Sequence, residues 1–213
     1  MSRIVIIGGH GKVALLLAEL LAARGDEVIS LIRDPAQAAD VSATGATPLG
    51  LSVEEATETE LAAALKGADA VVWSAGAGGK GGPARTDAVD RRAAIRSMEA
   101  ARAAEASRYI MISWIGSHGG EPLAADHHLQ TTGLDWTIVG PGTLTLQEPT
   151  GRIDVGRLEA GASGPTSRAN VAAVVAAALT EPVTIGRVIP FRDGDTPIEQ
   201  ALADVPAELA DLS

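Results

Sequence analysis

The sequence predicts a doubly wound α/β fold, in which a parallel sheet carries helices on both faces. Three observations predict it. Short apolar runs alternate with segments of helical periodicity along most of the chain. Ala70–Ser74 is apolar without alternation, which is typical of a strand buried on both faces. The run Arg3–Gly8 leads through glycines directly into an amphipathic helix, as the first βα unit of such a fold does.

Capping and breaking residues place the elements of the first part of the chain. Leucines recur at helical spacing in Lys12–Arg24, and Gly25 ends this helix. Asp34 and Pro35 suit the N-cap and the first position of a short helix. The strands expected here are Arg3–Gly8, Glu27–Ile32, Thr47–Leu51 and Ala70–Ser74.

The same alternation continues through the rest of the chain. Thr57 and Glu60 have the spacing of a capping box, ahead of a helix that ends near Lys66. Ser167 is the expected N-cap of a helix over Ala169–Thr180. The other expected elements are helices Thr86–Ala106, Ala124–Thr131 and Pro197–Leu202, and strands Tyr109–Ser113, Asp135–Gly140 and Arg187–Phe191.

Length and composition suit one domain over residues 1–213. The chain is 46% hydrophobic but only 2% aromatic, so aliphatic side chains must build its core. The segment Thr143–Pro165 has weak periodicity. We expect it to form a small C-terminal cap on the substrate side, at the carboxyl ends of the strands.

The charge of the chain excludes several classes of partner. A formal net charge of −10 argues against nucleic-acid binding and against attraction to an anionic membrane. No apolar stretch is long enough to span a bilayer. The N-terminus enters a strand pattern directly, so we expect no signal peptide and a cytoplasmic location.

Metal and thiol chemistry are not expected. The chain has no cysteine, which excludes disulfides and thiolate ligands. Asp126, His127 and His128 are adjacent and lack metal-ligand spacing. The expected partner is a small-molecule substrate. Alanines in the Thr86–Ala106 helix permit close helix approach, while its arginines suit a solvated face, so monomer and homodimer both remain open.

The glycine cluster after the first expected strand indicates a phosphate-bearing ligand. Glycines allow a sharp turn and close approach of phosphate oxygens, and the first N–H groups of the next helix favour negative charge. We therefore expect a pyrophosphate cofactor here, with a tight turn that binds no ligand as the alternative. The residues expected to bind it are Gly8, Gly9, His10, Gly11, Lys12 and Val13, with Ala14 allowing close helix packing.

The residue after the second expected strand selects the dinucleotide. An acidic residue there bonds the ribose hydroxyls of NAD, whereas a basic one pairs with the 2′-phosphate of NADP. Arg33 follows this strand directly and offers a planar fork for phosphate. The sequence therefore predicts NADP, with NAD as the alternative. A solvated loop charge is the alternative interpretation of Arg33. Lys12 could add to the attraction for phosphate or be an exposed charge at the start of the helix.

Small residues follow the fourth expected strand. Ser74, Ala75 and Gly76 leave room at the carboxyl edge of the sheet, where a doubly wound fold binds its ligand. We expect them to contact a flat cofactor that lies across this edge. A flexible loop is the alternative, and the two interpretations are compatible.

Several segments spread over nearly the whole chain carry a family resemblance. They are Ile7–Val13, Leu31–Pro35, Gly67–Val72, Arg108–Ser113, Thr132–Val139 and Arg168–Ala172. Together they resemble the atypical short-chain dehydrogenase/reductase group, which implies a Rossmann fold that binds NAD(P). Within that group the chain is similar to small biliverdin/flavin reductases and NmrA-like NADP sensors. Asn170 stands where the group's R-x-D-V-A motif has aspartate, and Gln147–Gly151 looks like the substrate-side stretch of the flavin reductases.

The chain departs from this group at the catalytic positions. The resemblance implies a Tyr-x-x-x-Lys pair, but its two positions fall near His118 and Pro122. Tyr109, the one tyrosine, lies within an expected strand and has no lysine four residues on. The group's acidic residue that touches adenine falls near Leu51, and its arginine before Pro-Gly is replaced by Gly140.

Two residues remain candidates for catalysis. Ser113 ends the fifth expected strand, where its hydroxyl can bond a substrate carbonyl or simply satisfy the strand end. His118 follows in the next loop and has a side-chain type suited to proton transfer near neutral pH, unless it is only an exposed histidine.

Three functions are therefore compared. The first is an NADPH-dependent oxidoreductase acting on a flavin, quinone or similar conjugated molecule, which takes hydride at a ring atom and a proton from water. Ser113, His118 and Gln147–Gly151 would border that substrate. The second is a non-catalytic NADP-binding sensor, which the loss of the Tyr–Lys pair favours. The third is a sugar-nucleotide-type epimerase or dehydratase, which normally requires the missing tyrosine.

Overall fold

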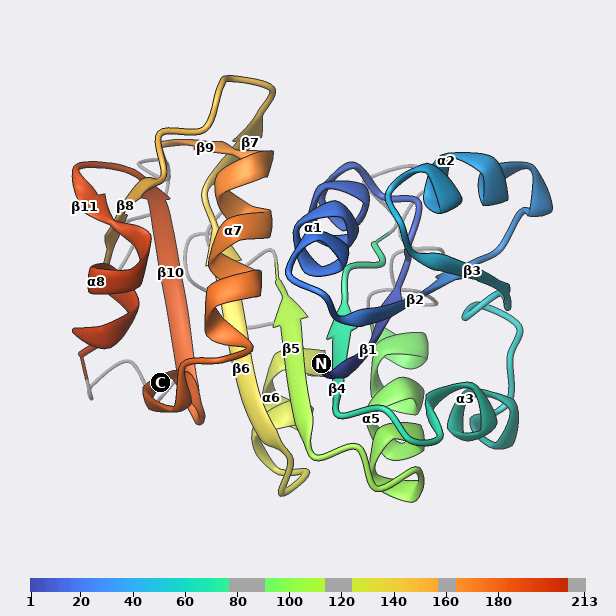
Figure 1. Cartoon of the computed structure of the whole chain (residues 1–213). Helices are drawn as coiled ribbons and strands as arrows, with labels where there is room; N and C mark the ends of the chain where they lie inside the picture. The colour runs from blue at the N-terminus through green and yellow to red at the C-terminus, as the bar shows by residue number, and fades with distance from the viewer. Residues whose placement is uncertain (77–90, 114–123, 157–163, 207–213) are drawn as a thin grey trace.

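The computed structural model describes residues 1–76, 91–113, 124–156 and 164–206. Their main sheet has nine strands, and helices lie against both of its faces (Figure 1). In chain order these strands are β1 (Arg3–Ile7), β2 (Glu27–Ile32), β3 (Thr47–Gly50), β4 (Ala70–Trp73), β5 (Arg108–Ile112), β6 (Asp135–Pro141), β8 (Arg152–Val155), β10 (Arg187–Asp193) and β11 (Thr196–Pro197). A separate pair joins β7 (Thr143–Thr145) to β9 (Pro165–Ser167).

The helices follow the strands in alternation. They are α1 (Lys12–Ala23), η1 (Pro35–Gln37), α2 (Ala38–Ala43), α3 (Glu58–Leu65), α5 (Ala94–Ala103), α6 (Ala124–Gln130), α7 (Arg168–Ala178), η3 (Pro182–Thr184) and α8 (Ile198–Ala203). Among the described residues, no helix is both long and apolar enough to cross a bilayer.

The strand order confirms the doubly wound fold. The sheet runs β11-β8-β10-β6-β5-β4-β1-β2-β3, and every pair from β10 to β3 is parallel. β8 and β11 extend the other edge in antiparallel fashion. The order reverses at β1, which pairs with β2 on one side and β4 on the other. Ligands of such sheets bind at this reversal, beyond the carboxyl ends of the strands.

Strand β1 supplies both hydrophobic cores. Ile4 and Ile6 pack with residues of α1 and α7, whereas Val5 and Ile7 pack with residues of α3, α5 and α6. Successive side chains of a strand face opposite sides of a sheet, so an unbroken apolar run suits a strand covered on both sides. All four side chains are buried.

Local sequence signals account for most element boundaries. Asp34 accepts a hydrogen bond from the N–H of Ala36 at 2.9 Å and so caps η1. Thr57 and Glu60 form the expected capping box of α3. Ser167 occupies the N-cap position of α7 but makes no capping bond, because its hydroxyl donates to the carbonyl of Gln147 instead. Residues 86–90 of the long expected helix lie outside the described residues.

The expected cap over Thr143–Pro165 has regular structure in its described part. β7 pairs with β9, and β8 joins the main sheet beside β10. These strands have only 3, 3 and 4 residues, too few to produce a clear alternation in the sequence. The segment therefore belongs partly to the edge of the main sheet.

A buried amide explains the asparagine of the Arg-x-Asn-Val-Ala segment. Asn170 donates to Asp193 Oδ1 at 2.7 Å and to Thr150 Oγ1 at 3.2 Å, and its oxygen accepts the N–H of Gly151. The second oxygen of Asp193 accepts the N–H of Ser167 at 2.8 Å. Aspartate at position 170 would face the carboxylate of Asp193 directly, and like charges at this distance repel strongly.

We predict that N170D lowers the free energy of unfolding at pH 7 by about 2 kcal/mol, because one hydrogen bond is lost and two carboxylates are brought together. Adding D193N to N170D restores a donor–acceptor pair and should recover most of that loss. Urea unfolding of both variants measures the effect, with D195N on the exposed neighbouring Asp195 as the control for charge removal. Equal destabilisation of the single and double variants would contradict the assignment.

Candidate functional site

The candidate site is a cavity of about 570 Å³ at the carboxyl ends of the parallel strands. Its walls come from the loops after β1, β2, β3 and β4, from the ends of β5 and β6, and from the start of α7. It therefore spans the point where the strand order reverses. One flank holds the residues expected to bind adenosine, and the opposite flank lies beyond β5.

Two glycines bring the loop after β1 against its neighbouring strands. Gly8 has φ +83, and a Cβ there would lie 2.6 Å from Ala75 Cα. A Cβ on Gly9 would lie 2.4 Å from Ser30 Cβ. Neither position has room for a side chain. Gly8 lines the cavity, whereas Gly9 does not; its N–H donates to Leu31 within the protein.

Helix α1 begins at the cavity without a side-chain cap. Its N-cap is Gly11, and its first turn has no acidic residue. Gly11, Lys12 and Val13 line the cavity. Uncapped N–H groups at a helix start, together with the helix dipole, favour a phosphate. The residues thus fit the pyrophosphate of a nicotinamide dinucleotide.

His10 also lines the cavity, and its ring forms a hydrogen bond with a residue of α2. His10 Nε2 lies 2.8 Å from Asp40 Oδ2. This contact anchors the glycine loop to the helix that follows β2. The described geometry therefore indicates a role for His10 in holding the loop beside the ligand, in addition to lining it.

Arg33 lies at the adenosine flank and is paired with a residue that the sequence analysis did not identify. Arg33 Nη1 lies 3.3 Å from Glu54 Oε1, and both side chains line the cavity. Arg96 holds the Glu54 loop by donating to the carbonyl of Val53 at 2.7 Å. A bound 2′-phosphate must therefore compete with the Glu54 carboxylate for Arg33. Leu51, at the position of the group's adenine-binding acid, lines the same flank.

The small residues after β4 lie where they were expected. Ser74, Ala75 and Gly76 all line the cavity, and the N–H of Ser74 donates to Ile7 at the end of β1. They form the middle of the cavity wall, between the start of α1 and the end of β5. Small side chains here leave the cavity open across the sheet edge.

A buried hydroxyl–carboxylate pair lies at the end of β5. Ser113 lines the cavity and donates to Asp126 Oδ2 at 2.7 Å, and the Asp126 side chain is fully buried on α6. The proton of the Ser113 hydroxyl is therefore directed at the carboxylate of Asp126. Sequence reasoning placed Ser113 here but missed Asp126, which it considered only as a metal ligand.

Tyr109 is a core residue. Its side chain is fully buried at the amino end of β5, away from the cavity, and its hydroxyl lies 2.8 Å from Ser97 Oγ. Burial raises the pKa of Tyr109 far above its ordinary range. The one tyrosine of the chain is thus excluded from acid–base chemistry in this cavity.

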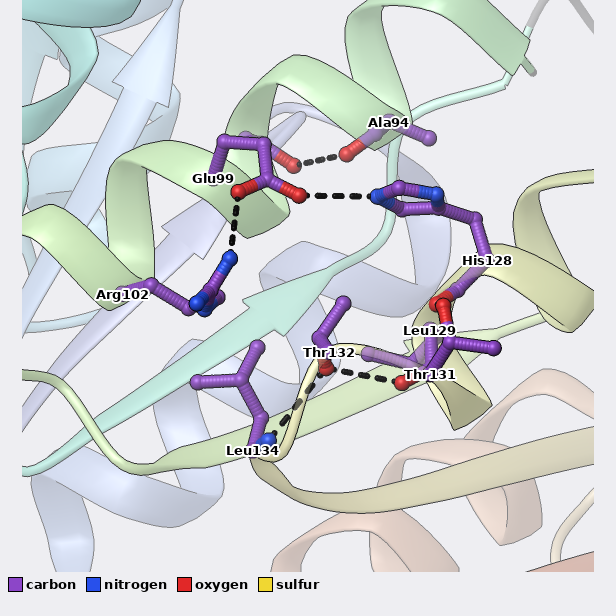
Figure 2. Close-up of polar contacts among 9 residues, drawn as sticks. Ala94, Glu99, Arg102, His128, Leu129, Thr131, Thr132 and Leu134 are labelled. Carbon is purple, nitrogen blue, oxygen red and sulfur yellow. Dashed lines mark hydrogen bonds and ion pairs between the residues drawn. The ribbon is translucent and has the colours of Figure 1, made fainter.

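Helix α6, which carries Asp126, is tied to α5 by charged side chains. Figure 2 shows Glu99 between His128 and Arg102, with both contacts at 2.8 Å. The hydrogen bond from His128, together with Arg102, lowers the pKa of Glu99. These contacts hold α6 in the position from which Asp126 reaches Ser113.

Other sequence expectations fall outside this geometry. His118 and Trp114 lie outside the described residues. The cavity lining within the described residues includes none of Gln147–Gly151, although the preceding Leu144 lines it. In the same part of the chain, no cluster of acidic and histidine side chains is arranged to hold a metal ion.

The comparisons with known proteins agree with this fold. The NAD(P)H-binding family matches residues 8–182, so the chain belongs to this family. It is 35% identical to the uncharacterized sugar epimerase YhfK of Bacillus subtilis, over 94% of this chain and 98% of that protein.

Two solved structures show the same fold over nearly the whole length. One, from Bacillus halodurans and provisionally named an NAD-dependent epimerase/dehydratase, has a TM-score of 0.87 and 29% identity, covering 96% of this chain and 100% of that one. The other, the oxidoreductase ylbE of Lactococcus lactis, has a TM-score of 0.81 and 27% identity, covering 95% and 96%.

We predict that E99Q destabilises the protein at pH 7 and that its deficit shrinks in acid. The pKa of Glu99 is below its ordinary value of 4.5, so its ionised form stabilises the fold above that pH. This stabilisation is lost as the pH falls through the lowered pKa. Urea unfolding at pH 7 and pH 3 measures the change in stability, and E19Q, at the exposed Glu19 of α1, is the control. A deficit of the same size at both pH values would contradict the pairing.

Proposed function

We propose that this protein is an NADPH-dependent reductase of a flavin, quinone or similar conjugated small molecule. The observation that carries the proposal is the cavity itself. It joins an uncapped helix start, suited to a pyrophosphate, to the Ser113 hydroxyl across the sheet edge. The only tyrosine is buried elsewhere in the core. Such a site favours an acceptor that needs no tuned protein acid.

The cofactor lies across the strand ends in this proposal. Gly11, Lys12 and Val13 face its pyrophosphate, and Arg33 faces the phosphorylated ribose. Ser74–Gly76 lie under its middle, which leaves Ser113 at the nicotinamide end. When bound, NADPH supplies a hydride.

Ser113 positions the acceptor in the proposed reaction. Asp126 holds the Ser113 hydroxyl at the cavity wall, where the Ser113 side chain contacts the acceptor. A flavin or quinone takes hydride at a ring atom and then a proton from water. The buried pair thus fixes orientation, and solvent completes the proton transfer.

The relatives' names leave an epimerase as the competing function. YhfK and the Bacillus halodurans protein carry epimerase names, whereas ylbE is named an oxidoreductase. Epimerases of this superfamily use the tyrosine of the Tyr–Lys pair. In this chain Tyr109 is buried in the core and hydrogen-bonded to Ser97, so it cannot take that role. A non-catalytic NADP sensor remains the second alternative. Mixing the protein with NADPH and a panel of flavins and quinones tests the reductase, by the loss of reduced nicotinamide absorbance.

We predict that S113A and D126N each reduce kcat/KM for the accepted flavin or quinone about tenfold, the effect of one hydrogen bond to a charged group. The double variant should resemble the single ones, because the two residues act as a unit. NADPH affinity measured by calorimetry should stay unchanged. S97A, which removes an equally buried hydroxyl away from the cavity, is the control. Unaltered kinetics in both variants would remove Ser113 from the mechanism.

We predict that Arg33 and Glu54 set the preference between NADP and NAD in opposite directions. R33Q should weaken NADP+ binding about thirtyfold relative to NAD+, because a charge-assisted phosphate contact is lost. E54Q should strengthen NADP+ binding about threefold, since both partners are partly exposed and the freed arginine no longer faces a competitor. Calorimetry with both nucleotides measures this. An R33Q protein that keeps its preference would refute the NADP assignment.

A further inference from the structure

A positively charged side chain lies at the flank of the cavity beyond β5, here called the acceptor flank. The proposed reaction does not yet use this side chain. Arg168 is the first residue of α7, is half-buried and lines the cavity together with Gly142 and Leu144. We infer that Arg168 binds an anionic group of the acceptor, a carboxylate or a phosphate. This inference rests on the proposed function and deepens it by naming a substrate class.

The fold holds the start of α7 firmly at this place. β9, which runs directly into α7, pairs with β7 just after the end of β6. The N–H of Ser167 donates to Asp193 Oδ2, and the Ser167 hydroxyl donates to the carbonyl of Gln147 at 3.0 Å. Arg168 is therefore positioned by the contacts of β9 and of Ser167, which directly precede it in the chain.

Among the described residues, no ion pair balances the charge of Arg168. In the described ranges, Arg168 makes no hydrogen bond or ion pair, whereas Arg33 at the opposite flank is paired with Glu54. Each carboxylate oxygen of Asp193 accepts a hydrogen bond, one from the N–H of Ser167 and one from Asn170. Of the described residues that line the cavity, Glu54 is the one carboxylate, and it belongs to the other flank. A half-buried cation in this position is stabilised by an anion from a ligand.

The strand order separates Arg168 from the pyrophosphate site. α1 starts beside β1, while α7 starts beyond β6, three strand positions along the sheet. Adjacent strands lie roughly 4.8 Å apart, so β1 and β6 are separated by about 14 Å across the sheet, although α1 and α7 pack against each other on one face of it. Arg168 lines the cavity together with Gly142 and Leu144, which follow β6. We therefore assign the partner of Arg168 to the molecule bound over β5 and β6, beside Ser113.

Guanidinium chemistry narrows the class of acceptor. Arginine binds carboxylate and phosphate groups through two parallel N–H donors. A flavin with a phosphorylated side chain and a quinone bearing a carboxylate both offer such a group next to a conjugated ring. A neutral ring lacks it and leaves Arg168 unpaired.

Binding to the protein saturated with NADP+ tests the inference without requiring turnover. Fluorescence quenching compares flavin mononucleotide with riboflavin, and competition compares a carboxylated naphthoquinone with neutral naphthoquinone. The wild-type protein should prefer the anionic member of at least one pair about tenfold. In R168Q that ratio should fall to near one, and R168K should retain part of it. R187Q, at the amino end of β10 and away from the cavity, controls for the loss of one positive charge.

Each outcome separates this inference from the proposed reductase activity. An equal ratio of anionic to neutral affinity in wild type and R168Q would overturn the anion site. A tenfold loss of NADP+ affinity in R168Q would also overturn it, because it would assign Arg168 to the cofactor. If the ratio falls as expected but NADPH is oxidised by no acceptor, the anion site stands in a sensor. If an acceptor is reduced but anionic and neutral acceptors bind equally well, the reductase proposal stands and only the role of Arg168 is refuted.

Discussion

The cavity depends on the close approach of the loop after β1 to its two neighbouring strands, where two glycines leave no room for a side chain. Gly8 meets Ala75 at the end of β4, and Gly9 meets Ser30 within β2, each at a distance that excludes a Cβ. These contacts fix the loop between β1 and α1 against both neighbouring strands. The uncapped start of α1 is therefore held at the reversal of strand order, where the sheet edge opens. A larger residue at either glycine would move the start of α1, and with it the uncapped N–H groups there.

The opposite flank is organised by side chains rather than by backbone. Asp126 is buried on α6 and fixes the Ser113 hydroxyl, while Glu99 and His128 hold α6 against α5. On the far side, Asn170 and Asp193 anchor the start of α7, which presents Arg168. Ser113, held by the buried Asp126, and the half-buried Arg168 therefore line one cavity from different elements. A buried charge without a partner is costly, so the proposed anion site at Arg168 favours a ligand that supplies one.

Family membership and chemistry are separate conclusions for this chain. The chain belongs to the NAD(P)H-binding family, and proteins with epimerase and oxidoreductase names share its fold. Loops and helix ends, which build the acceptor flank, are the parts of a fold that vary most between proteins. The loss of an accessible tyrosine is consequently more informative about the reaction than the overall similarity is.

The sequence alone determined the order and type of the main elements and the position of the glycine loop at the carboxyl edge of the sheet, because periodicity, caps and the contiguous residues 8–13 are local signals. It missed β7, β8, β9 and β11, whose 2 to 4 residues are too short for a pattern. Only the tertiary structure decided the pairings Ser113–Asp126 and Arg33–Glu54 and the placement of Arg168 in the same cavity. These residues come from separate elements, and the order of strands in the sheet, rather than their spacing in the chain, brings them together.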